Sequence, residues 1–260
     1  SILDPHDCVD WIAGLLNAPQ TDKATHWTIE EYRQKTIDNL SFNMPIGSFA
    51  DRNRSRYVRE SLAALKANCQ MLGLANYTTP IRLHFLESKE MVAKKISAWA
   101  DAQQPDIHLV ANEESEPPLQ RELMQIMAIQ QWGLPAKSSA WMKEGLASYA
   151  ANSSDGYTVD QIYRYMLEHN HLLPMNLLTS DFYNQSAIIG RHQSAYIVQY
   201  LLEQYGLAQF EQLWKAGFGQ FEAIYSQSFE EVEKALHQAI RAELVQSPEI
   251  QWERFIKAGR

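Results

Sequence analysis

The sequence from residue 119 to residue 244 has helical periodicity almost throughout, and this constrains the fold more than any other feature. Apolar residues recur at the spacing of one helix face in six segments, which are separated by Gly, Pro or Asn-Ser breaks. We expect helices over residues 119–132, 139–151, 158–169, 191–204, 207–216 and 228–244. The last segment begins with a capping box, Ser228-Phe-Glu-Glu231. Residues 117–260 are therefore predicted to form a helical C-terminal lobe.

Residues 1–116 have a mixed pattern, which predicts a smaller N-terminal lobe that contains helices and a small sheet. Alternating apolar and polar residues indicate strands, and amphipathic or capped segments indicate helices. The expected elements are a helix over 28–40 that opens with the capping box Thr28-Ile-Glu-Glu31, a loop over 41–55, a helix over 56–72, a strand over 81–85, a helix over 91–102 and a strand over 107–110. The predicted fold class is therefore α+β and predominantly helical.

Composition excludes several classes of protein and partner. Of the 260 residues, 45% are hydrophobic and 21% are charged, which is typical of a globular chain rather than a disordered one. The net charge of −8 argues against nucleic acid or an anionic membrane as the partner. No apolar run approaches the length of about 20 residues that spans a bilayer. We therefore expect no nucleic-acid partner and no membrane span.

The N-terminus and the two cysteines bear on the cellular compartment. The sequence has no signal peptide, but it begins at Ser1 without Met, so the absence of a targeting segment decides nothing about the compartment. We expect the protein to be exported, to the periplasm or the cell surface. Cys69 lies on the apolar face of the helix over 56–72, where a buried free thiol is expected. In an exported protein, a disulfide between Cys8 and Cys69 is the alternative.

The first of the six predicted helices carries the candidate site. Arg121, Glu122 and Gln125 lie in one sector of this helix, because positions three and four apart share a face. A solvated polar stripe is one interpretation. However, Gln125 is the single polar residue in an otherwise apolar run, so we expect it to be buried and to line an internal cleft. Glu144 follows nineteen positions after Gln125 and is also embedded in apolar and small residues.

Three segments resemble the core of a gluzincin-type zinc metallopeptidase, a peptidase-MA-like enzyme with a thermolysin-like core. They are Pro118-Leu-Gln-Arg-Glu-Leu123, Gln131-Trp-Gly133 and Trp141-Met-Lys-Glu-Gly-Leu-Ala-Ser-Tyr149. The segments that begin at His192 and Gly206 resemble the helices that follow this core in bacterial members, so the likeness covers roughly residues 80–245. It implies an N-terminal lobe whose sheet edge borders a cleft, and a helical lobe that carries the third metal ligand.

The resemblance implies a position for each candidate residue. In active relatives, the two histidines of a His-Glu-x-x-His motif and a later glutamate bind zinc, and the glutamate of the motif activates a metal-bound water. Arg121 and Gln125 stand at the two histidine positions, Glu122 stands at the general base and Glu144 at the third ligand. His192 and Tyr196 lie one helical turn apart, where relatives place a residue that stabilises the oxyanion. Ordinary packing is the alternative for both of them.

Arg121 and Gln125 are not zinc ligands, and this decides the predicted function. A guanidinium has no lone pair for a metal and an amide oxygen binds zinc poorly, so Glu144 remains alone and no zinc or other cofactor is expected. Without the metal, the pKa of the attacking water returns from about 7 to about 15.7, which corresponds to roughly 12 kcal/mol. Glu122 as a general base contributes only about 3–5 kcal/mol. Hydrolysis by the family mechanism should therefore be lost.

Two positions of the Arg121 side chain are consistent with this sequence. Arg121 can stand in for the metal as a cation that pairs with Glu122, Glu144 or both, since two carboxylates in an apolar site are costly without a counter-charge. The alternative is neutral drift, with the side chain extended to solvent. We favour the pairing.

The sequence thus predicts a pseudopeptidase, which is an inactive metallopeptidase homologue that serves as a binding or scaffolding module for a peptide or protein in the cleft. One alternative is an active peptidase or hydrolase with an atypical site. Another is a structural subunit of a cell-envelope assembly, which the seven Trp and twelve Tyr residues suggest because aromatic side chains are common at interfaces.

Overall fold

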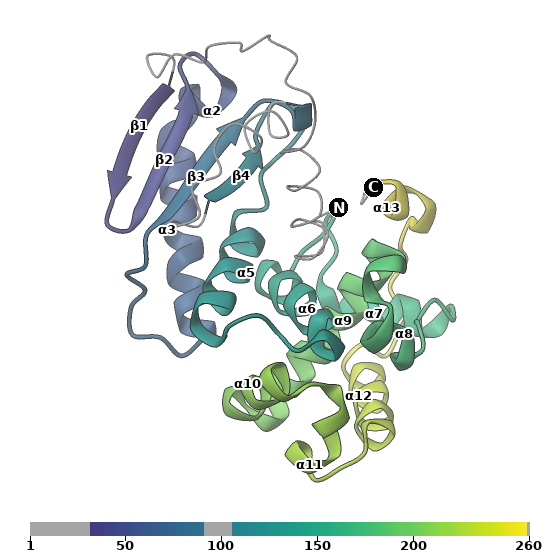
Figure 1. The fold of residues 1–260 in the computed structure, drawn as a ribbon. Coiled ribbons are helices and arrows are strands. Elements are labelled where there is room, and N and C mark those ends of the chain that lie inside the picture. Colours follow the sequence, from purple (N-terminus) through teal and green to yellow (C-terminus); the bar gives the residue numbers. More distant parts are fainter. Residues whose placement is uncertain (1–31, 91–105, 259–260) are drawn as a thin grey trace, which may run out of the picture. The chain divides into compact units, whose positions relative to one another are not determined.

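A computed structural model of the chain describes residues 32–90 and 106–258. These residues divide into two compact units (Figure 1): residues 32–66 with 75–90 and 106–119, and residues 67–74 with 120–258. The first unit contains a four-stranded sheet, and the second is built from helices. The fold class is therefore α+β and predominantly helical, as predicted. None of the helices in the described ranges is long and apolar enough to cross a bilayer.

The sheet of the first unit has the strand order β1-β2-β3-β4. Its strands are β1 (Tyr32–Ile37), β2 (Leu40–Pro45), β3 (Ile81–Leu86) and β4 (Asp106–Val110). β1 pairs antiparallel with β2, whereas the other two pairings are parallel. The central strands are the most buried ones, and their apolar side chains form the core of this unit. The strands predicted over 81–85 and 107–110 are thus confirmed.

The helix and loop predicted for residues 28–55 are wrong where the structure describes them. Residues 32–45 form the hairpin of β1 and β2, and a short helix α2 (Phe49–Arg52) follows. The prediction gave too much weight to a capping box that lies before residue 32. It overlooked the alternation in Leu40-Ser-Phe42-Asn-Met44, whose three apolar side chains are buried. β1 is an edge strand with mostly exposed side chains, so its composition carries little signal.

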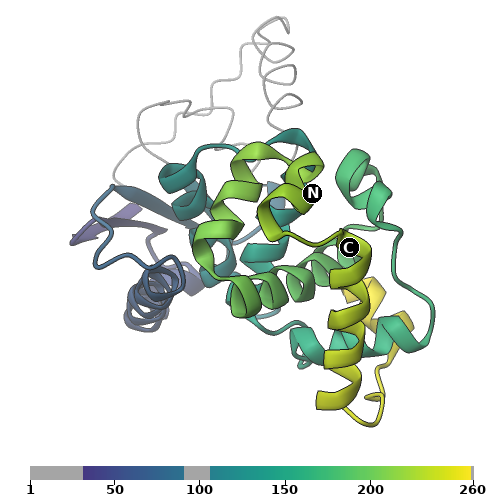
Figure 2. The same ribbon diagram turned by 90° about the horizontal axis from the view of Figure 1, so that it is seen from below.

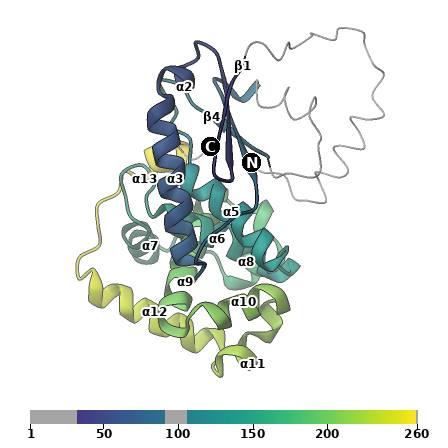
Figure 3. The ribbon, with the colours of Figure 1, turned by 90° about the vertical axis from the view of Figure 1, so that its left-hand side faces the viewer.

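Helix α3 (Arg54–Met71) confirms the helix predicted over 56–72. It runs along one face of the sheet (Figure 3), where the ring of Tyr57 packs against that of Phe85 with centroids 5.1 Å apart. Cys69 is a buried free thiol, as expected. Cys8 and the predicted helix over 91–102 lie outside the described residues.

The second unit contains all six helices that the periodicity predicts (Figure 2). They are α5 (Leu119–Trp132), α6 (Ala140–Ala151), α7 (Val159–Glu168), α9 (Ala187–Tyr205), α10 (Leu207–Ala216) and α12 (Phe229–Glu243). Three short helices lie outside the six predicted segments: α8 (Met175–Ser180), α11 (Phe221–Tyr225) and α13 (Trp252–Ala258). α9 begins four residues earlier than predicted and packs against α6, α7 and α10.

The contact between α6 and α9 is unusually close at Gly145. A Cβ atom placed on Gly145 would lie 2.6 Å from the backbone oxygen of Ser194 and 2.8 Å from Cγ2 of Val198. Only glycine fits there, because such distances are well below van der Waals contact. The close approach matters for the site, since Glu144 directly precedes this glycine.

Candidate functional site

Helices α5 and α6 hold four of the six residues that the sequence singled out. Arg121 and Glu122 lie in the first turn of α5, and Gln125 lies one turn later. The side-chain amide of Asn68 donates a hydrogen bond to the backbone oxygen of Gln120, in the first turn of this helix, at 3.0 Å. Glu144 lies on α6, where every residue from 141 to 148 is buried. The burial predicted for Gln125 is confirmed.

Arg121 bridges the two glutamates. Its Nη1 pairs with Oε1 of Glu122, and its Nη2 lies 2.5 Å from Oε2 of Glu144. The amide nitrogen of Gln125 donates a hydrogen bond to the other oxygen of Glu144 at 3.1 Å. The exposed fractions of the Arg121, Glu122 and Glu144 side chains are 14%, 19% and 6%. The predicted ion pairing is therefore present, and the alternative of an Arg121 side chain extended to solvent is wrong.

Burial and charge oppose each other at Glu122. Burial raises its pKa above the usual value, and the negative charge of Glu144 adds to this rise. Arg121 acts in the opposite direction, through its charge and its hydrogen bond. The guanidinium therefore stabilises two carboxylates that would otherwise repel each other in a mostly dry site.

The residues present do not fit a zinc ion. The guanidinium of Arg121 lies against both carboxylates and has no lone pair for a metal. Gln125 directs its amide nitrogen, a donor, towards Glu144. Across residues 32–90 and 106–258, no three His, Cys, Asp or Glu side chains are grouped so that they could hold a metal ion.

His192 is a buried, neutral neighbour of this cluster. Its Nδ1 donates a hydrogen bond to the backbone oxygen of Ile188 at 2.7 Å, and its ring lies 5.2 Å from that of Phe255. Burial, together with the charges of Arg191 and Arg121, lowers the pKa of His192 to about 4 against the opposing effect of the hydrogen bond. These contacts account for the packing of His192, and its role in chemistry stays a prediction.

Tyr196 belongs to a different environment. Its ring stacks on that of Tyr163 with centroids 4.4 Å apart. Burial raises the pKa of the Tyr196 hydroxyl, and the negative charges of Asp160 and Glu243 raise it further. The electrostatic neighbours of Tyr196 are therefore acidic residues of α7 and α12 rather than the Arg121 cluster.

Two cations near the cluster were not found from the sequence. Lys143 is buried, with Nζ 3.9 Å from Oε1 of Glu144 and 5.6 Å from the ring centre of Tyr183. Arg191 lies on α9 and is partly buried, and burial together with the charge of Arg121 lowers its pKa. The sequence did contain a signal, because Lys143 directly precedes Glu144 and Arg191 directly precedes His192. A charged side chain within an otherwise apolar helix is rarely buried without a partner.

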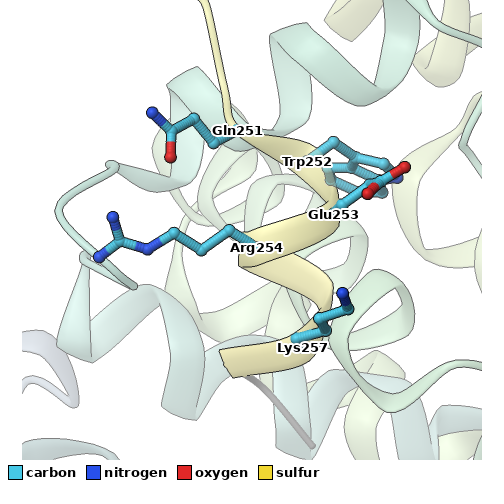
Figure 4. A pocket seen from close by; sticks show the side chains of 5 residues that line it. All are labelled: Gln251, Trp252, Glu253, Arg254 and Lys257. Carbon is cyan, nitrogen blue, oxygen red and sulfur yellow. The ribbon is translucent and has the colours of Figure 1, made fainter.

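A surface hollow of the second unit lies at another place. It has a volume of about 750 Å³ and lies along α13, lined by Gln251, Trp252, Glu253, Arg254 and Lys257 (Figure 4). In this view Gln251 and Arg254 point to one side of the helix, whereas Trp252 and Glu253 point to the other. None of the residues that the sequence singled out lines this hollow, so the candidate site remains the Arg121 cluster.

Comparison with known proteins gives no assignment for this chain. No protein-family model matches the sequence, no curated protein matches it, and no solved structure matches the fold.

Proposed function

We propose that the chain is an inactive homologue of gluzincin-type metallopeptidases and serves as a binding or scaffolding module for a peptide or protein. One observation carries this proposal: the guanidinium of Arg121 binds the carboxylates of both Glu122 and Glu144. In an active relative these two residues would be the general base and the third metal ligand. Here the positive charge that they require comes from the chain itself.

This arrangement argues against hydrolysis in two ways. The first is the donor set, since a site with Arg121 and Gln125 at the ligand positions does not lower the pKa of a water molecule as a metal does. The second is the ion pair, because a carboxylate oxygen of Glu122 that binds Arg121 is not available to take a proton from water. We therefore expect little hydrolysis of a substrate that binds next to Glu122.

The same arrangement is compatible with binding. Arg121 and Glu122 keep part of their surface exposed, so a ligand can reach the cluster from solvent. Around them, α5 and α6 are apolar and largely buried. A small polar group set in apolar surroundings is typical of binding sites in general.

The test is zinc content, measured on the purified protein after incubation with zinc and removal of free metal. We expect well under one equivalent, because Glu144 alone does not hold the ion against water. The double substitution Arg121→His with Gln125→His should bind zinc, since it supplies three ligands. At zinc concentrations of 100 to 1,000 times the dissociation constant, binding should raise the free energy of unfolding by roughly 3–4 kcal/mol.

The control adds Glu144→Gln to the double variant, which should lose the zinc again. The proposal would be overturned by stoichiometric zinc in the unsubstituted protein that Glu144→Gln removes. Zinc-dependent peptide hydrolysis that Glu122→Gln abolishes would overturn it equally.

A further inference from the structure

We propose that Arg191 binds a carboxylate group of the ligand, next to the Arg121 cluster. Arg191 is in the second turn of α9, three residues before Ser194 and seven before Val198, so the three residues share one face of the helix. This is the face that contacts α6 at Gly145, the neighbour of Glu144. Arg191 therefore lies on the α6 side of α9, one turn before the closest approach of the two helices.

Electrostatics agree with this placement. The charge of Arg121 lowers the pKa of Arg191, whereas the charges of Glu144 and Glu122 raise it. Arg191 is thus close enough to all three groups to interact with them. It also lies beside Gly190, whose missing side chain leaves room for Phe182: a Cβ there would be 3.1 Å from Cε2 of that ring.

Arg191 differs from the other cations of the site because it has no ion-pair partner among the described residues. Arg121 is held by two carboxylates, and Lys143 lies near one of them. Burial nevertheless desolvates part of the Arg191 guanidinium, which is unfavourable for a charge without a counter-charge in contact. A partly desolvated guanidinium whose N–H donors have no partner among the described residues can bind an anion that is not part of this chain.

The charges of the cluster indicate which anion fits. Three cations face two carboxylates: Arg121, Lys143 and Arg191 against Glu122 and Glu144. One negative charge would balance the site, and a carboxylate carries one charge in a planar shape that the guanidinium fork binds through two hydrogen bonds. A phosphate dianion would leave an excess of negative charge beside two buried glutamates. The ligand group is therefore a carboxylate, either the C-terminus of a peptide or an acidic side chain.

This inference rests on the proposed binding function, and its test is independent of zinc. Three peptides are titrated against the full chain in EDTA at constant ionic strength: acetyl-Ala-Leu-Ala with a free C-terminus, the same peptide as its amide, and acetyl-Ala-Glu-Ala-amide. Isothermal titration calorimetry gives each affinity, and inorganic phosphate is titrated in parallel. The variants are Arg191→Gln, Arg191→Lys and Arg59→Gln. Arg59 is an exposed arginine of α3 and controls for the change in net charge.

We expect one or both carboxylate peptides to bind at least about tenfold more tightly than the neutral amide, and the stronger of the two identifies the source of the group. Arg191→Gln should abolish this preference, Arg191→Lys should keep part of it, and Arg59→Gln should leave it unchanged. Without ligand, Arg191→Gln should not lower the melting temperature, since it removes an unpaired charge.

Three results would overturn the inference: equal or no binding of all three peptides by the unsubstituted protein, phosphate binding as tight as that of the carboxylates, or a preference that survives Arg191→Gln. A large fall in the melting temperature of unliganded Arg191→Gln would also overturn it, because Arg191 would then be structural. None of these results bears on the zinc measurement, so the two proposals fail separately.

Discussion

The ion pairs of Arg121 give the most direct test of the site. Replacing Arg121 with alanine removes the cation that binds Glu122 and Glu144. Glu144 keeps the hydrogen bond from Gln125 and the more distant Lys143, whereas Glu122 loses a partner in direct contact. Breaking a buried pair in this way costs about 3–5 kcal/mol. We place Arg121→Ala towards the lower end of that range, because Glu144 is partly compensated.

The assay is denaturant unfolding at neutral pH, read as the change in free energy of unfolding. Arg241→Ala is a suitable control, because Arg241 is half exposed and pairs with the exposed Glu168 at 3.2 Å. An exposed pair of this kind contributes about 0–1 kcal/mol.

A double-mutant cycle with Glu144→Gln measures the direct interaction. The two substitutions together should cost less than the sum of their separate effects by about 0.5–3 kcal/mol, since neither charge is then left unpaired. The reasoning is refuted if Arg121→Ala costs no more than Arg241→Ala, or if Arg121→Ala and Glu144→Gln are simply additive.

Three further predictions concern the second unit. Gly145→Ala should lower the free energy of unfolding by about 1–3 kcal/mol, because its Cβ would lie 2.6 Å from the backbone oxygen of Ser194. Gly219→Ala is the control and should cost little, since its Cβ would meet open space. Equal shifts in melting temperature for the two variants would contradict this. His192 has its pKa lowered to about 4, so the unfolded state binds its proton first and stability should fall by about 3 kcal/mol between pH 6.5 and pH 4. This loss should be smaller in His192→Gln, and identical pH profiles would refute it. Ser228→Ala should cost about 1 kcal/mol in urea unfolding through loss of the N-cap of α12, and no change would exclude that contribution.

Long helices and the spacing of the motif residues could be predicted from the sequence. α5 and α6 carry enough periodic residues to be placed within a residue or two. The nearness of Gln125 and Glu144 was expected only because the resemblance puts both at metal-ligand positions, and the hydrogen bond between them agrees with it. The pairing of Arg121 followed from the cost of two buried carboxylates without a counter-charge. Local pattern, the resemblance and electrostatics were together sufficient for this part of the site.

Features that depend on tertiary contacts could not be predicted. α8 and α13 have at most seven residues, and helices of this length are stable only through packing. The position of Arg191 beside Arg121 depends on how α9 crosses α6, which no local pattern encodes. β1 has little apolar alternation because its side chains face solvent at the edge of the sheet.

The bridging guanidinium also has a consequence for how this sequence can evolve. A three-ligand zinc site requires changes at both Arg121 and Gln125, and these arise one at a time. A change at Arg121 alone releases Glu122 and Glu144 from their cation and still leaves too few ligands for the metal. A change at Gln125 alone leaves the guanidinium at the place of the ion. Each intermediate is therefore without zinc, and the route through Arg121 also loses the ion pairs, so neither single change gains the stability that a bound metal would supply.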